Sequence, residues 1–283
     1  MEYWFKDKYT DGTEFNIKIE KYVYSIKSKI QQIDIFDSVD FGRVLIIDGE
    51  LMSTEKDGFI YDEMMVHPAM AVNPGIKDVL VVGVGNAGII RELIKYKTLN
   101  SIKIIESDKN LITVVKRFFP ADAKALSDPR VSIQICDDMK YMRLAHNEYD
   151  LIILDIADPY GPGENHFTRE YYGNCYTALR DEGILINQHE SCFYEEDALA
   201  CQKAHKNSAN VFDISRVFQA SIPSYASGHW LFGFSSKKFH PQKDINKSVW
   251  KALGIKTRYY NANLHLGAFA LPTYVENFIK AVE

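Results

Sequence analysis

A glycine-rich turn is the first feature of the sequence that could do chemistry. The segment GVGNAG, residues 83–88, follows the apolar run DVLVVGV and opens AGIIRELIKYK, which has the pattern of a helix. Glycines there allow a tight backbone turn and the close approach of a ligand. Glu106 ends the next apolar run, 18 residues after Gly88, where a carboxylate can accept both hydroxyls of a ribose. The combination predicts a nucleoside site, of the kind that NAD enzymes and S-adenosylmethionine enzymes share.

Further carboxylates follow the next apolar runs. Asp137 ends VSIQICD and is followed by Asp138, while Asp155 ends YDLIILD and is followed by Asp158. Ligands bind at the carboxyl ends of the strands in an open parallel sheet, so we expect acids around one crevice. Like charges that close repel unless a cation, such as a sulfonium ion or a polyamine, compensates them. No His/Asp/Glu cluster has metal-ligand spacing, so we expect no metal ion. The alternative role for any one of these acids is to cap a helix.

The composition is that of a globular protein with a sizeable core, and its charge permits a cationic ligand. The 283 residues are 46% hydrophobic and carry a net charge of −5, which argues against nucleic acid as the main partner. The four cysteines show neither CxxC nor metal spacing, which predicts reduced thiols in a cytosol. The N-terminus is too charged for a signal peptide, and no apolar run reaches the ~18 residues of a membrane helix. We therefore expect a cytoplasmic protein without membrane contact.

Two halves of the chain differ in the period of their apolar residues. From residue 15 to about residue 53, alternation and Asp-Gly turns predict five or six antiparallel strands and hairpins. Residues 55–73 have a helical period. From residue 78, apolar runs alternate with helical segments, which predicts a parallel sheet with helices on both faces. The expected strands are 78–84, 101–107, 131–137, 149–155 and 184–190, and the expected helices are 87–97, 110–119 and 169–183, the last ending at a glycine stop.

Several longer segments, in this order, resemble the polyamine aminopropyltransferases, spermidine synthases in particular. They include QQIDIFDS, FGRVLIIDGELMSTEKDGFIYDEMMVHP, VLVVGVGNAGIIREL, YDLIILDIADPYGPGENHFTREYYGNC, GILINQHES and IPSYASGHWLFGF. The Asp-x-x-Asp-Pro-x-Gly-Pro segment followed by FTREYY is specific to this family. The resemblance covers nearly the whole chain.

This resemblance implies a fold and an activity. The fold is α/β, with a small N-terminal antiparallel β domain, residues 1–54, on a Rossmann-like S-adenosylmethionine-dependent transferase domain, residues 55–283. The activity is transfer of an aminopropyl group from decarboxylated S-adenosylmethionine, a co-substrate and not a prosthetic group, to a diamine, commonly putrescine. Spermidine and 5′-methylthioadenosine are the products. The partner is a small molecule, and the assembly is a homodimer or homotetramer.

The resemblance also implies roles for individual residues. Asp155 matches the general base, with Tyr61 as its helper. The amine-binding set is Tyr61, Asp62, Asp158, Gln188 and Tyr225. The set that binds the nucleoside donor is Gln31, Gly83, Gly85, Asn86, Glu106, Asp137, Asp138 and Pro162.

Three of these residues depart from the family pattern in their charge, and one of them, Asp138, stands where the family usually has a glycine. Asn86 stands where the family has an aspartate that pairs with the ammonium of the donor's aminopropyl group, so donor affinity is expected to fall about tenfold. Asp62 replaces a histidine and adds negative charge near the amine tunnel, which favours a longer or more highly charged amine. Two alternatives follow: a related enzyme that uses intact S-adenosylmethionine for carboxyaminopropyl or methyl transfer, and a non-catalytic homologue that binds nucleoside or polyamine.

Overall fold

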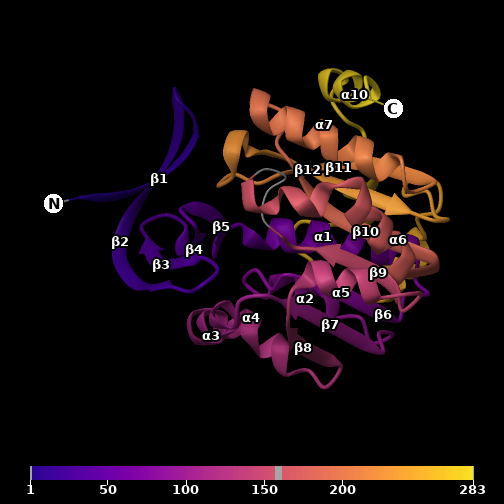
Figure 1. The fold of residues 1–283 in the computed structure, drawn as a ribbon, viewed down its shortest axis with the longest axis horizontal. Helices are drawn as coiled ribbons and strands as arrows, with labels where there is room; N and C mark the ends of the chain where they lie inside the picture. The colour runs from indigo at the N-terminus through magenta and orange to yellow at the C-terminus, as the bar shows by residue number, and fades with distance from the viewer. Residues whose placement is uncertain (1, 157–160, 283) are drawn as a thin grey trace.

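The N-terminal part of the chain forms a five-stranded antiparallel sheet at one end of the molecule (Figure 1). The computed structural model describes residues 2–156 and 161–282. The strands follow one another in the sheet in sequence order. They are β1 (Tyr3–Thr10), β2 (Thr13–Lys27), β3 (Gln32–Ser38), β4 (Gly42–Ile47) and β5 (Glu50–Thr54).

The sequence pattern did not reveal β1, since the predicted strands began at residue 15. This strand pairs with β2 in register from Tyr3 opposite Ile19 to Thr10 opposite Thr13. Burial alternates along β1, with Phe5, Asp7 and Tyr9 less exposed than their neighbours. The most buried of these positions is an aspartate, however, and Trp4 is 49% exposed, so the residue types do not show the apolar alternation of a half-buried strand.

A second, seven-stranded sheet forms the centre of the molecule in the order β11-β12-β10-β9-β6-β7-β8. Neighbouring strands from β10 to β8 are parallel, as the alternating pattern predicts. These five are the strands that the sequence predicted; β11 and β12 at the other edge were not predicted, and β12 runs antiparallel to both β10 and β11. The strands are β6 (Asp78–Val82), β7 (Ser101–Glu106), β8 (Val131–Ile135), β9 (Tyr149–Leu154), β10 (Leu179–Glu190), β11 (Ile214–Ser221) and β12 (His229–Ser236).

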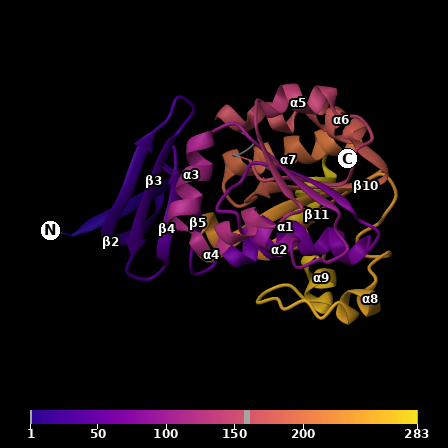
Figure 2. The same cartoon turned by 90° about the horizontal axis from the view of Figure 1, so that it is seen from below.

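Helices cover both faces of the central sheet (Figure 2). Alternation along β6 sends Leu80 and Val82 to the face covered by α5, α6 and α7, while Val79 and Val81 face the core that contains α1 and α2. Short 3-10 helices are η1 (Lys124–Ser127), η2 (Gly161–Phe167) and η3 (Ala226–Gly228). The α-helices are α1 (Gly58–Val72), α2 (Gly88–Leu93), α3 (Lys109–Phe118), α4 (Pro120–Ala123), α5 (Asp138–Leu144), α6 (Arg169–Ala178), α7 (Glu195–Ala209), α8 (Lys247–Ala252), α9 (Ala262–Ala268) and α10 (Thr273–Lys280). Among the described residues, no helix has both the length and the apolar character of a membrane-spanning segment.

The helix α6 ends earlier than the predicted helix 169–183. The helix stops at Ala178, and the following residues already belong to β10, where Leu179 pairs with Tyr149 and Ile184 with Leu151. The extra residues between these two pairs form an irregularity in the strand. Gly183 does not end a helix. It lies in this irregularity, where there is no room for a side chain, because a Cβ atom there would lie 2.6 Å from the Cβ of Leu179.

Side chains of the N-terminal sheet join the central core directly. Ile33 and Ile35 of β3 and Leu45 of β4 are fully buried in the cluster that contains α1 and β6. On the same side of the sheet, Arg43 donates from Nη1 to the backbone oxygen of Phe118 at the end of α3, at 3.1 Å. The N-terminal sheet is therefore packed against the α/β part and can contribute to a site between them.

Candidate active site

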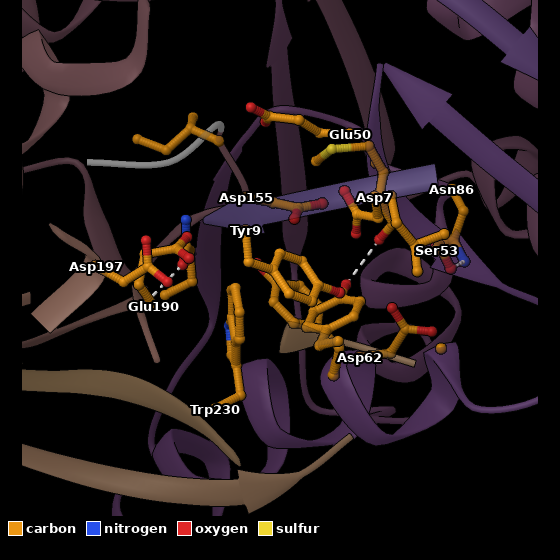
Figure 3. A pocket seen from close by; sticks show the side chains of 18 of the residues that line it. Asp7, Tyr9, Glu50, Ser53, Asp62, Asn86, Asp155, Glu190, Asp197 and Trp230 are labelled. Carbon is orange, nitrogen blue, oxygen red and sulfur yellow. Dashed lines mark hydrogen bonds between the residues drawn. The ribbon is translucent and has the colours of Figure 1, made fainter. Parts of the chain in front are cut away.

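A cavity of about 350 Å³ lies where β5, the start of α1, the glycine loop and the carboxyl ends of β9 and β10 meet (Figure 3). Its described lining carries seven carboxylates but only one lysine, Lys8. Such a wall favours a ligand with positive charge. The seven are Asp7, Glu50, Asp62, Asp155, Glu190, Glu196 and Asp197.

The glycine loop makes room for Asp155 at the end of β9. The Asp155 backbone N–H donates to the Val82 oxygen at 2.8 Å, which holds β9 beside β6 at this point. A Cβ atom on Gly83 would collide with the backbone oxygen of Asp155, and one on Gly85 would collide with its carboxylate. Both glycines also have positive φ, +89° and +46°. In this structure, therefore, the turn leaves space for a carboxylate.

Asp155 has the charge state and the partner that a general base needs. The hydroxyl of Tyr61, on α1, donates a hydrogen bond to its carboxylate. Burial raises the pKa of Asp155 to about 6, and the hydrogen bond from Tyr61 opposes this rise. Above that pH the side chain is mainly a carboxylate, with a higher proton affinity than an exposed aspartate.

Aromatic rings form one wall beside this pair. The Tyr61 ring lies 6.1 Å from the Tyr225 ring, between centroids, and Tyr225 lies 4.7 Å from Trp230 in an edge-on arrangement. The Tyr225 hydroxyl donates to the Met52 oxygen of β5 at 2.7 Å. This bond and the ring contacts fix the position of Tyr225 in the wall, and a tyrosine ring is able to pack against a ligand or make a cation–π contact.

A buried aspartate connects the segments that carry these aromatic residues. Asp57 precedes α1 and accepts hydrogen bonds from the backbone N–H and the hydroxyl of Ser224, both at 2.9 Å. Tyr225 follows Ser224 directly, and Tyr61 lies in the first turn of α1. The Asp57–Ser224 contact thus fixes the two tyrosines relative to one another.

Both polar atoms of the Asn86 side chain make hydrogen bonds within the protein. Its Nδ2 donates to Oγ of Ser53 on β5, and its Oδ1 accepts from the backbone N–H of Gly88, both at 2.8 Å. The side chain therefore ties the N-terminal sheet to the glycine loop. A carboxylate at this position would still accept from Gly88 but would have no N–H group to offer to Ser53.

The carboxylate of Asp62 lies beside the loop and does not stand alone there. It is 4% exposed, and its Oδ2 lies 3.0 Å from Nη2 of Arg91 on α2. Burial raises the pKa of Asp62 well above its usual range, while Arg91 opposes this rise and Asp122 and Asp155 add to it. The extra negative charge expected at position 62 is thus balanced in part by Arg91.

Glu106 and Asp137, two carboxylates expected to bind the donor, are not among the described residues that line this cavity. Glu106 accepts from the Val84 N–H at 3.1 Å and from the Asp108 N–H at 2.7 Å. Burial raises its pKa to about 7, against these two backbone hydrogen bonds. Asp137 is more exposed and caps α5 by accepting from the Lys140 N–H at 3.0 Å. Of Glu106, Asp137 and Asp155, which the sequence predicts around one crevice, only Asp155 is among the described residues that line this cavity.

Asp138 has partners of its own near α6. Its Oδ2 lies 2.7 Å from Nε2 of His166 and accepts from the hydroxyl of Tyr171 at 3.0 Å. These contacts hold η2 and α6 against α5, so in this structure Asp138 joins elements of the protein to one another. Pro162 lies within the same η2 segment.

The remaining expected site residues fall in three places. Gln188 on β10 is buried in the cavity wall, where its Oε1 accepts from the Glu190 N–H at 3.0 Å. Gln31 lies in the turn between β2 and β3, where its N–H donates to Oγ of Ser28 at 2.9 Å, and it is not among the described lining residues. Asp158 lies outside the described residues. In the part of the chain that the structure describes, no group of three His, Cys, Asp or Glu side chains is arranged to hold a metal ion.

Sequence reasoning missed much of the acidic wall. Glu190 ends a parallel strand, so the rule for strand ends would have found it. Glu196 and Asp197 open α7, and Asp7 comes from β1, which carried no recognisable strand pattern. Their convergence depends on tertiary packing that no local signal reports.

Comparisons with known proteins agree along the whole chain. Residues 58–247 match the family described as "Spermine/spermidine synthase domain", and residues 3–55 match "Spermidine synthase tetramerisation domain". A polyamine aminopropyltransferase of Clostridium beijerinckii is 50% identical over 282 residues, covering 100% of this chain and 99% of the relative. One of Clostridium perfringens strain 13 is 51% identical over 284 residues, covering both chains fully.

Solved structures give the same result at lower identity. A spermidine synthase in complex with the transition-state analogue AdoDATO superposes with a TM-score of 0.95 at 34% identity, covering 99% of this chain and 95% of the other. A spermidine synthase from Thermotoga maritima superposes with a TM-score of 0.91 at 33% identity, covering 98% and 94%.

Replacing Gly88 with alanine should destabilise the protein although the residue is helical. A Cβ atom at this position would collide with the carboxylate of Asp62, so we expect Gly88→Ala to lower the free energy of unfolding by about 1–3 kcal/mol. Gly173 in α6 is the matched control, because nothing lies within 4 Å of its Cβ position. Gly173→Ala should raise the free energy of unfolding by about 0.5–1 kcal/mol. Urea titrations measure both, and stabilisation by Gly88→Ala would contradict the assigned contact.

Replacing Asp155 with asparagine should stabilise the protein at neutral pH. The pKa of Asp155 is raised from 3.8 to about 6 in the folded protein, so ionisation there opposes folding above pH 6. We expect Asp155→Asn to raise the free energy of unfolding by about 1–3 kcal/mol at pH 7.5. The native protein takes up its proton as the pH falls, so this gain should vanish between pH 6 and pH 4. A gain that persists at pH 4 would show that the carboxylate's charge is not its source.

Proposed function

The chain belongs to the spermine/spermidine synthase family, and from this premise we propose that its cavity transfers an aminopropyl group from decarboxylated S-adenosylmethionine to a diamine such as putrescine. The products are spermidine and 5′-methylthioadenosine. The observation that carries this proposal is Asp155, a carboxylate with a raised pKa that is hydrogen-bonded to Tyr61 in a cavity lined by acids.

The reaction needs a base and an aligned pair of substrates. The reacting carbon of the donor is bound to a sulfonium, which is already a good leaving group. The attacking amine has an ordinary pKa near ~10, so it must lose a proton before it can attack. Asp155 takes that proton, the new carbon–nitrogen bond forms, and the electron pair of the breaking carbon–sulfur bond stays on sulfur. Holding the two substrates in line can supply roughly 7–11 kcal/mol of the rate enhancement.

The cavity has a donor end and an acceptor end on either side of the base. Figure 3 shows Asp155 between Asn86, Ser53 and Asp62 on one side and Glu190 and Asp197 on the other. We assign the first side to the donor's aminopropyl group, because the nucleoside loop lies there. The nucleoside itself would lie against Gly83 and Gly85, with Glu106 on its ribose and Gln31, Asp137 and Pro162 around its base. Asp138 acts in this scheme by holding η2, which contains Pro162.

The second side suits the far ammonium of the acceptor. Glu190, Glu196 and Asp197 supply negative charge there, and Tyr61, Gln188 and Tyr225 line the path from Asp155. Asp158 belongs to the same group by its sequence motif. At the donor end, the thioether product 5′-methylthioadenosine no longer carries the sulfonium charge that the carboxylates of the cavity attract, which helps it to leave.

The alternatives raised by Asn86 are not favoured. Relatives about 50% identical along the full chain are named polyamine aminopropyltransferases, and the protein keeps Asp155 beside Tyr61.

We also infer a homodimer or homotetramer built through the N-terminal sheet, which matches a tetramerisation domain and exposes Tyr3, Trp4 and Tyr22. All four cysteines are free thiols, which fits a reducing cytoplasm.

Turnover should depend on the ionisation of Asp155. Release of 5′-methylthioadenosine from decarboxylated donor and putrescine should show kcat/KM falling about tenfold per pH unit below about 6, since the protonated carboxyl cannot accept the amine proton. Asp155→Asn should lose turnover and keep donor binding by calorimetry. Release only from intact S-adenosylmethionine would contradict the proposed function. Near-normal turnover by Asp155→Asn would remove the base assigned here.

A further inference from the structure

The carboxylate of Asp62 occupies the space where a side chain on Gly88 would lie. The side chain reaches from α1 to the position that a Cβ atom on Gly88 would fill, and both oxygens lie near that point. Asp62 and Asn86 line the same cavity, and each touches Gly88: Asn86 through the backbone N–H and Asp62 through the vacant side-chain position. The two side chains are therefore neighbours at one end of the cavity.

Asn86 is poorly suited to hold an ammonium group. An ammonium has three donors and no acceptor, so it needs oxygen atoms around it. The single side-chain oxygen of Asn86 already accepts from Gly88, and its nitrogen donates to Ser53. A cation at this end of the cavity needs a carboxylate, and Asp62 is the carboxylate beside Asn86.

The charges around Arg91 leave room for one more cation. Arg91 contacts the carboxylates of Asp62, Glu92 and Asp122. Lys95 is a second cation, and it contacts Glu92, as does the ring of His67. Three carboxylates thus share two permanent positive charges. Of the three, only Asp62 is among the described residues that line the cavity. A cation bound in this cavity would therefore complete the charge balance of the group through Asp62.

Resting on the proposed function, we propose that Asp62 binds the ammonium of the donor's aminopropyl group, in place of a carboxylate at position 86, and that Arg91 positions Asp62 for this contact. This assigns Asp62 to donor recognition and not to the acceptor end, where its sequence position suggested an effect on amine length. The same contact selects the decarboxylated donor. A carboxylate on the carbon that bears the ammonium would lie against Asp62, and like charges repel.

The test compares Asp62→Asn with Asp122→Asn. Both variants remove a charged partner of Arg91, but Asp122 is not among the described lining residues, so it controls for loss of the ion pair. Calorimetry measures the Kd of decarboxylated S-adenosylmethionine and of 5′-methylthioadenosine, which has the same nucleoside without the aminopropyl group. Steady-state kinetics measures the KM of donor and of putrescine separately.

The proposal predicts a selective loss in Asp62→Asn. Its Kd and KM for the decarboxylated donor should rise about tenfold, the difference between a charge-assisted and a neutral hydrogen bond. Its Kd for 5′-methylthioadenosine and its KM for putrescine should change less than twofold. Its preference for decarboxylated over intact donor should also fall. Moving the carboxylate back in Asp62→Asn/Asn86→Asp should restore most of the donor affinity, which a structural defect at position 62 would not allow.

Three results would overturn the proposal. One is a rise in the putrescine KM of Asp62→Asn with an unchanged donor Kd. Another is an equal loss of donor affinity in Asp62→Asn and Asp122→Asn. The third is a parallel loss of 5′-methylthioadenosine binding in Asp62→Asn, which would mean that the loop itself is damaged. Failure of the proposed function gives a different result. The unaltered protein would then bind the decarboxylated donor but would not transfer the aminopropyl group to any diamine.

Discussion

The site depends on a steric constraint at the glycine loop, where two acidic side chains occupy space that other residues would fill. Asp155 fits against Gly83 and Gly85, and Asp62 fits against Gly88. A larger residue at any of these three positions would displace a carboxylate or the backbone behind it. The loop therefore does more than turn the chain from strand to helix. It brings two buried carboxyl groups into the lining of the cavity.

Burying two carboxylates close together is unfavourable when no ligand is bound. Burial raises the pKa of both Asp62 and Asp155, and each is partly balanced from within, by Arg91 and by the hydroxyl of Tyr61 respectively. We propose that cationic substrates complete that balance. The attraction for a cation and the high proton affinity of the base thus have one origin, which is a partly buried wall with seven carboxylates among its described residues.

The sequence predicted the parts of this arrangement that lie in local patterns. The alternation of apolar runs and helices predicted the central sheet, and the position of Asp155 at a strand end predicted its place in the site. The antiparallel strand β12 was not predicted, and neither was β1, because its most buried position is the polar residue Asp7, which interrupts the apolar alternation and lines the cavity. The pairing of Asp62 with Arg91 was also invisible, because it joins α1 to α2 across 29 residues. Such contacts depend on how elements pack.

The central claim is that Asp155 is held in a state of raised proton affinity which a cationic substrate relieves. Carbon-13 NMR titration of the aspartate carboxyl groups tests this most directly, with the Asp155 signal assigned by its absence in Asp155→Asn. We predict a pKa of about 6 in the free protein and a clearly lower pKa when putrescine saturates the cavity. A pKa near 4 in the free protein, or one that putrescine leaves unchanged, would contradict the account.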